Sequence, residues 1–167
     1  MRRSQLGLGV VAYWMVRPLL FLYLNESHRT RVIVVHDQKI AVVRAWLGDG
    51  KWSLPGGGIH KGELPEVSAA RELKEETKLN LSPGDLKFLS VEKITSHGIT
   101  TSIHYFFYIS PTLETLKAGR PEITSADWLN IEKLDNKVAG IDVLTGLRTW
   151  KESGHFGTIK PVSESDN

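Results

Sequence analysis

Four of the five glutamates that follow a run of three glycines are the part of this sequence most able to do chemistry. The stretch GGGIHKGELPEVSAARELKEETKLNL covers residues 56–81 and contains Glu63, Glu72, Glu75 and Glu76. On a helix, residues three and four apart share a face, so Glu72 would lie beside both Glu75 and Glu76. Because Mg²⁺ and Mn²⁺ prefer carboxylate and carbonyl oxygens as ligands, this spacing allows a divalent-metal site.

A solvated acidic helix is the alternative interpretation of the same residues. Lys74 and Lys78 lie close enough in sequence to neutralise part of the acidic face. The glycine segment 56–58 favours the metal site, because glycines permit close approaches that side chains would block. Gly62 would then turn the chain so that Glu63 reaches back towards the helix.

The helix that has to carry these glutamates is predicted over residues 64–78. Pro65 suits the first turn of a helix, and Glu66 would lie at the positive end of the helix dipole. The residues that recur at helical spacing are Val67, Ala70, Leu73 and Thr77. A closing helix is predicted over residues 138–151, with one apolar side formed by Val143, Leu144, Leu147 and Trp150.

Strands are predicted on both sides of the first helix. Before it, β-branched runs suggest a hairpin turning near Asp37 and Gln38, followed by a short strand; after it come two long strands joined by a TSHG loop, and one shorter strand. The predicted strands are 31–37, 39–47, 51–54, 86–94, 100–110 and 125–131. Strands outnumber helices, which favours an α+β or sandwich-like domain with helices packed on its faces.

The bulk composition limits the partners and the compartment. The chain of 167 residues is long enough for one domain with its own core. Its formal net charge is +2, but residues 1–31 hold five arginines and one glutamate, which leaves −2 for the rest. Nucleic acid is therefore an unfavoured partner. The absence of cysteine excludes disulfides and thiolate metal sites and is compatible with a reducing, cytoplasmic compartment.

Residues 6–24 form an apolar run interrupted by Arg17. Its length is close to the ~20 residues that a helix needs to span a bilayer. Arg17 would cost roughly 2.5–3.5 kcal/mol at the centre of a bilayer, and Pro18 would kink the helix. Three interpretations stay open: a helix packed on the domain or on a second copy in a homodimer, a membrane-surface or re-entrant anchor, and a true span.

The segment from Gly57 to Leu79 resembles the Nudix box, the signature of the Nudix hydrolases. That signature is a glycine, five residues, a glutamate, seven residues and then Arg-Glu-aliphatic-x-Glu-Glu-x-Gly-aliphatic. Every charged position of the signature is present at the matching spacing, namely Glu63, Arg71, Glu72, Glu75 and Glu76. The resemblance implies a Nudix-like mixed β-sheet sandwich with the box helix and the C-terminal helix packed on it, spanning residues 28–158. An apolar N-terminal helical segment (1–27) and a tail (159–167) would flank it.

One position departs from the signature, because Lys78 stands where the pattern has glycine. That glycine allows a left-handed residue to end the helix. A left-handed lysine would cost on the order of 1 kcal/mol, or else the helix runs on to Asn80. The expected metal ligands all lie upstream of this change.

The resemblance also implies an activity and roles for residues. Nudix hydrolases cleave a nucleoside diphosphate linked to another moiety, with water attacking phosphorus and Mg²⁺ or Mn²⁺ bound. The principal metal ligands would be Glu72 and Glu76, with Glu75 sharing the ions and the backbone carbonyl of Gly56 as a further ligand. The catalytic set would be completed by Arg71, which holds the glutamates and the loop in place, and by Glu63, which supports Arg71 or an outer ion.

The general base and the substrate contacts are less well defined by the resemblance. Glu122, six residues before Trp128, is a candidate that would complete the metal site; a solvent-exposed loop glutamate is the alternative. Gly57 and Gly58 are expected to contact the substrate, with Trp52 and Arg44 as further candidates. The aromatic residues Trp46, Trp52, Tyr105 and Phe107 could stack on a base, but such residues on strands more often fill a core.

The expected partner is a small-molecule nucleotide substrate. Two alternatives to this hydrolase are retained. One is a non-catalytic nucleotide-binding Nudix module, although such a module is expected to have lost a box glutamate and this chain retains all of them. The other is a hydrolase acting on RNA 5′ ends or on lipid-linked diphosphates, the latter favoured by the apolar N-terminal run.

Overall fold

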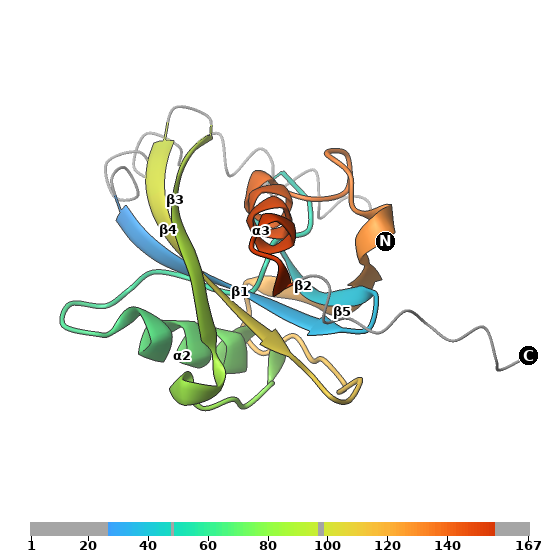
Figure 1. Cartoon of the computed structure of the whole chain (residues 1–167), viewed down its shortest axis with the longest axis horizontal. Coiled ribbons are helices and arrows are strands. Elements are labelled where there is room, and N and C mark those ends of the chain that lie inside the picture. The colour runs from blue at the N-terminus through green and yellow to red at the C-terminus, as the bar shows by residue number, and fades with distance from the viewer. Residues whose placement is uncertain (1–26, 48, 97–98, 156–167) are drawn as a thin grey trace, which may run out of the picture.

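A single five-stranded mixed sheet organises the fold (Figure 1). The computed structural model describes residues 27–47, 49–96 and 99–155. The strand order is β3-β4-β1-β2-β5, in which only β1 and β4 pair in parallel. The strands are β1 (Ser27–His36), β2 (Lys39–Ala45), β3 (Lys87–Ser96), β4 (Ile99–Ile109) and β5 (Ile123–Asn130).

Two helices cover opposite faces of this sheet. Helix α2 (Pro65–Thr77) lies on one face, and helix α3 (Ile141–Glu152) lies on the other (Figure 1). Two short 3-10 helices, Pro83–Asp85 and Ile131–Lys133, lie in the connections. The mixed sheet with one helix packed on each face confirms the predicted α+β class.

The alternation of side chains along β1 divides the core between the two helices. Ile33 and Val35 are fully buried in the cluster that contains Trp150 of α3. Val32 and Val34 point to the other face and join the cluster that contains Leu73 of α2. Since neighbouring strand residues face opposite ways, a continuous apolar run is what a strand covered on both faces requires.

The predicted hairpin and the predicted box helix are present, but the predicted strand 51–54 and the predicted start of the closing helix were wrong. The segment 51–54 forms only single bridges, from Ser53 to Val43 and from Trp52 to Ala139. The closing helix begins at Ile141 rather than at residue 138. The backbone N–H of Trp52 donates to the carbonyl of Val138, and the N–H of Gly140 donates to the carbonyl of Trp52. Gly140 has an extended backbone, with φ of −69° and ψ of 165°, so the helix begins only after this pairing.

Several sequence-based expectations fall outside the described residues. The apolar run 6–24, with its membrane and homodimer interpretations, lies there, as do residues 97–98 of the TSHG loop and the tail 159–167. Within the described ranges, no helix has the length and apolar character needed to cross a membrane.

Candidate functional site

Helix α2 presents two glutamates on the same side as its apolar residues. Glu72 is 3% exposed and Glu76 is 8% exposed, and they alternate with Ala69 and Leu73, which are fully buried against the sheet. Residues at this spacing lie along one stripe of a helix, so the carboxylates are carried to the edge of the core. Glu75 lies beside them with its side chain 38% exposed.

The glycine segment covers these carboxylates with backbone. A Cβ at Gly57 would lie 2.5 Å from the Glu72 carboxyl carbon, so any side chain there would displace Glu72. The segment is tied to β1, because the N–H of Thr30 donates to the Gly57 carbonyl at 2.8 Å. The N–H of Gly56 donates to Oε2 of Glu76 at 2.9 Å. The glycines therefore form one wall of a site whose other wall is α2.

Arg71 connects the glutamates with the glycine loop. Its Nε and Nη2 donate to the two carboxylate oxygens of Glu63 at 2.8 and 2.9 Å, a bidentate pair. Its Nη1 donates to Glu72 Oε1 at 2.7 Å, and its Nη2 donates to the Gly58 carbonyl at 3.2 Å. The hydrogen bonds from Arg71 lower the pKa of Glu63 to about 2, and the bond to Glu63 raises the pKa of Arg71. These charge-assisted bonds fix the orientation of the carboxylates.

The environment of Glu76 favours its neutral form. Burial raises the pKa of Glu76 to about 7, although the hydrogen bond from the Gly56 N–H and the charge of Arg31 act in the opposite direction. A carboxyl group taken out of water loses hydration of its charged form, which a nearby cation can restore. In the absence of an added cation, Glu76 therefore titrates near neutral pH.

Arg31 and Asp142 form a buried pair that the sequence reading did not single out. Arg31 Nε donates to Asp142 Oδ2 at 2.9 Å, and Arg31 Nη1 donates to the Gly56 carbonyl at 2.6 Å. Asp142 Oδ2 also accepts from the N–H of Leu54 at 3.1 Å. This pair fastens the glycine segment to the first turn of α3. The feature of the sequence that could have revealed this pair is the position of Arg31, two residues before the core residue Ile33. A cation on a buried strand face needs a partner.

Arg29 lies two residues before Arg31, on the same face of β1. Its Nε is buried and has no hydrogen-bond partner among the described residues. Burial and the neighbouring charge of Arg31 lower its pKa to about 10, whereas Glu72 and Glu76 act in the opposite direction. An incompletely paired guanidinium beside the carboxylates is a ready donor for an anion.

Arg120 reaches the carboxylates from the connection between β4 and β5. Its Nη1 lies 3.0 Å from Glu72 Oε2, and its Nη2 is ion-paired with Glu75 Oε2. The same Nη1 lies 3.7 Å from Glu122 Oε1, so the late candidate Glu122 belongs to this cluster. Nothing in the spacing of Arg120 marked it in the sequence, because only the folded loop brings it to α2.

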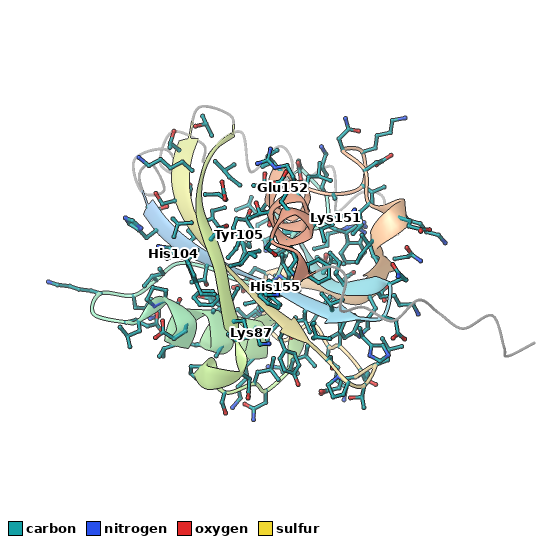
Figure 2. All side chains as sticks on the ribbon, viewed as in Figure 1. Lys87, His104, Tyr105, Lys151, Glu152 and His155 are labelled. Atoms are coloured by element: carbon teal, nitrogen blue, oxygen red, sulfur yellow. The ribbon has the colours of Figure 1, made fainter. Side chains whose placement is uncertain are left out.

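Of the remaining substrate candidates, Arg44 and Trp52 lie against each other, whereas Tyr105 and Phe107 lie in the core. The guanidinium of Arg44 lies 4.2 Å from the ring centre of Trp52, and no hydrogen bond in the described ranges links either to the α2 carboxylates. Phe107 and Tyr105 are core residues. The Tyr105 hydroxyl donates to the Asp142 carbonyl, and the ring lies between β4 and α3 (Figure 2). Trp46 is 44% exposed.

The donor set fits a divalent cation. Glu72 Oε2 is buried, and although Arg120 is close, no hydrogen bond of acceptable geometry reaches it. Glu75 and Glu76 supply further oxygens from the same helical turn, which are hard ligands of the kind Mg²⁺ and Mn²⁺ select. Among the residues that the structure describes, no three acidic or histidine side chains are already gathered as a preformed cage. The Gly56 carbonyl, expected as a ligand, accepts from Arg31 instead.

Comparisons with known proteins agree with this fold. The family model of the NUDIX domain matches residues 26–145. Nudix hydrolase 10 of Arabidopsis thaliana is 28% identical over 129 residues, which is 74% of this chain and 45% of that protein. A MutT NUDIX hydrolase from Burkholderia pseudomallei superposes with a TM-score of 0.66 at 18% identity, covering 75% of this chain and 98% of the other.

A third comparison is a structure with bound ligands. The bifunctional NMN adenylyltransferase/ADP ribose pyrophosphatase from Francisella tularensis, complexed with AMP and a Mn ion, has a TM-score of 0.66 at 18% identity. It covers 86% of this chain and 46% of the other. The chain spans about half the length of the first curated relatives that it matches, 45% and 60%. This chain belongs to the Nudix hydrolase family.

Proposed function

We propose that this protein hydrolyses the diphosphate linkage of a nucleoside diphosphate joined to another moiety, with Mg²⁺ or Mn²⁺ bound at the α2 carboxylates. The observation that carries the proposal is the buried Glu72 Oε2 under the glycine segment, which receives no hydrogen bond from the described residues and has only the charge of Arg120, 3.0 Å away, beside it. A buried carboxylate oxygen is costly unless a cation neutralises it, and a divalent ion could take that place.

Each residue of the site has a distinct task in this proposal. Glu72, Glu75 and Glu76 would hold the divalent ions, which when bound neutralise the phosphates and activate water for attack on phosphorus. Arg71 would keep Glu72 in place through its bond to Oε1 while Glu63 and the Gly58 carbonyl hold Arg71. The proton of the attacking water needs a carboxylate acceptor in this cluster, for which Glu75 and Glu122 are the more exposed candidates.

The substrate class follows from charge and from the neighbours. The buried Nε of Arg29, beside the α2 carboxylates, has no hydrogen-bond partner among the described residues, as a phosphate-binding group would before a substrate arrives. The Francisella protein carries AMP, and the NUDIX domain of Shewanella oneidensis NrtR, with a TM-score of 0.66 at 15% identity, carries ADP ribose. A nucleotide with two linked phosphates is therefore the proposed substrate.

Replacement of Glu76 by glutamine tests this function. Glu76→Gln should lower kcat by about 100-fold or more at saturating Mg²⁺, because it removes a charged metal ligand while an amide can still accept from the Gly56 N–H. The measurement is hydrolysis over a panel of nucleoside diphosphate sugars, dinucleoside polyphosphates, coenzymes and oxidised triphosphates, reading which bond is broken.

Glu66→Gln is the matched control on the same helix. Glu66 lies in the first turn of α2, away from the cluster, so its variant should turn over substrate like the wild type. Turnover of the Glu76→Gln variant near the wild-type rate would refute the metal assignment.

A further inference from the structure

We infer that Arg120 is a substrate-binding residue with two positions: it neutralises Glu72 and Glu75 in the metal-free protein, and it pairs with the substrate's diphosphate once divalent ions have taken those carboxylates. The inference rests on the proposed function, because it needs a metal at the α2 carboxylates and a phosphate-containing substrate. It gives this residue a role that the box signature does not contain, since Arg120 lies far beyond the box in the chain.

The guanidinium of Arg120 lies at the carboxylates where the proposed divalent ion would bind. Its guanidinium faces three carboxylates, from Glu72, Glu75 and Glu122. Arg71 holds Glu72 through Oε1, whereas Arg120 lies at Oε2. A divalent ion bound to Glu72 Oε2 and Glu75 would occupy the same oxygens, and two cations at one position repel each other. The guanidinium must therefore leave these oxygens when the ion binds.

The backbone around Arg120 is fastened to the end of α2. The N–H of Gly119 donates to the Glu76 carbonyl at 3.1 Å, and the N–H of Lys117 donates to the Thr77 carbonyl at 3.0 Å. These are carbonyls at a helix end, which have no partner within the helix. A Cβ at Gly119 would lie 2.0 Å from the Glu75 carbonyl oxygen, so only glycine permits this approach.

Two further contacts fix the backbone on either side of Arg120. The N–H of Ile123 donates to the Arg120 carbonyl at 3.0 Å, which closes a turn with Pro121 at its second position. On the other side, Nζ of Lys78 donates to the Gly119 carbonyl at 3.2 Å. Lys78, the residue that replaces the signature glycine, thus helps to hold the segment that carries Arg120.

A fixed backbone and a movable side chain together determine where the displaced guanidinium can go. The Arg120 side chain is 30% exposed, so it has room to rotate, but its backbone stays at the α2 carboxylates. After displacement it remains next to the bound ions, where the non-bridging oxygens of a diphosphate are the available anions. The planar guanidinium matches phosphate oxygens in a bidentate manner, which a lysine cannot do.

Metal binding without substrate separates this role from a merely structural one. The affinity of the full chain for Mn²⁺ alone is measured by calorimetry for the wild type, Arg120→Gln and Lys117→Gln. Arg120→Gln should bind Mn²⁺ about 3- to 30-fold more tightly, because the competing ion pairs are gone. Lys117→Gln removes the same charge from an exposed side chain in the same segment, and it should change the affinity by less than about 2-fold.

Kinetics with saturating Mn²⁺ supply the second readout. Arg120→Gln should raise KM for the hydrolysed nucleotide and lower kcat/KM by about 10-fold or more, since a charge-assisted bond to phosphate is lost. Arg120→Lys retains a positive charge, so its Mn²⁺ affinity should lie between those of the wild type and Arg120→Gln. Its kcat/KM should also lie between those of the wild type and Arg120→Gln. Tighter metal binding together with weaker catalysis is the signature that a scaffold residue would not produce.

Three results would overturn the inference. Unchanged or weaker Mn²⁺ binding by a folded Arg120→Gln variant would show that the guanidinium does not compete with metal. Wild-type kcat/KM in Arg120→Gln and Arg120→Lys would show that it does not contact the substrate. If neither the wild type nor the variants bind Mn²⁺, the proposed function falls as well, so the two failures are distinguishable.

Discussion

The surroundings of two glutamates in the same site shift their pKa values in opposite directions. Glu63 accepts two hydrogen bonds from Arg71 and one from the N–H of His60, which keeps it ionised. Glu76 is buried, and its charged form receives a single backbone N–H at Oε2. The pKa of Glu63 is lowered to about 2, so Glu63 is a carboxylate at neutral pH, whereas Glu76 changes its charge near neutral pH.

The pH dependence of the metal-free protein should follow Glu76. Burial raises its pKa from 4.5 to about 7, so between these values the folded state keeps a proton that the unfolded chain has lost. The free energy of unfolding should therefore fall as pH rises from about 5 to about 8, by an amount on the order of 3 kcal/mol from this group. Urea unfolding in EDTA at several pH values measures it.

Glu76→Gln provides the comparison for that measurement. Glutamine does not titrate, so the variant should equal the wild type near pH 5 and exceed its stability at pH 8. Glu63 does not interfere, because its pKa is lowered to about 2 and its contribution is lost only as pH falls below about 4.5. The same slope in wild type and variant would contradict the assignment to Glu76.

At the scale of single residues, the sequence could predict what lies within one helix and one loop. The spacing of Glu72, Glu75 and Glu76 depends only on helical geometry, and all three lie on α2, where Arg120 pairs with Glu72 and Glu75. Arg31, Asp142 and Arg120 come from other elements, and their meeting depends on sheet order and loop docking, which spacing does not contain. Tyr105 and Phe107, for which a core position was favoured, do lie in the core.

At the scale of elements, the end of α2 resolves the question posed by Lys78. The helix stops at Thr77, and Lys78 takes a left-handed conformation with φ of 67°. The alternative, a helix continuing to Asn80, is not realised. The lysine pays a conformational cost, but it gains the hydrogen bond from its amine to the Gly119 carbonyl.

Lys78→Gly should raise the free energy of unfolding by about 0.5 kcal/mol. Relief of a left-handed lysine contributes about 1 kcal/mol, and loss of an exposed hydrogen bond offsets part of it. Thermal or urea unfolding measures the difference. Lys78→Met is the matched control, since it keeps the strained backbone and loses only the amine, and it should be less stable than the wild type. A destabilised Lys78→Gly variant would show that the amine contact outweighs the strain.

The start of α3 shows why element bounds are hard to predict from local pattern. Val138 continues the apolar pattern of the helix in sequence, yet residues 138–140 pair with Trp52 instead. That pairing joins segments more than 80 residues apart, so no local window contains the reason. The helical segments were predictable where the pattern was long, as in α2, and were not where a distant segment competed for the backbone.

At the scale of the whole molecule, metal should stabilise the fold as a unit. The α2 carboxylates lie between the glycine segment attached to β1 and the connection that leads into β5, so an ion there would join three parts of the chain. If Mn²⁺ binds only the folded state, the free energy of unfolding should rise by about 2.7 kcal/mol at a free Mn²⁺ concentration 100 times Kd.

A thermal melt in Mn²⁺ against one in EDTA tests this coupling. The expected rise in Tm is roughly 5–10 °C for a domain of this size. Glu76→Gln should lose most of that rise, whereas Glu66→Gln should keep it. An identical Tm in Mn²⁺ and EDTA for the wild type would show that the ion does not bind the folded protein with useful affinity.

The parallel pairing of β1 with β4 also has a consequence for synthesis on the ribosome. Ser27 pairs with Thr101, and Val35 pairs with Ile109, so β1 emerges long before the strand that lies beside it. Until then the nascent chain offers a bare strand edge, which is the kind of surface that chaperones cover and that aggregates. The segment carrying Arg120 emerges later still, so the acidic cluster gains this arginine only after β4 has been made.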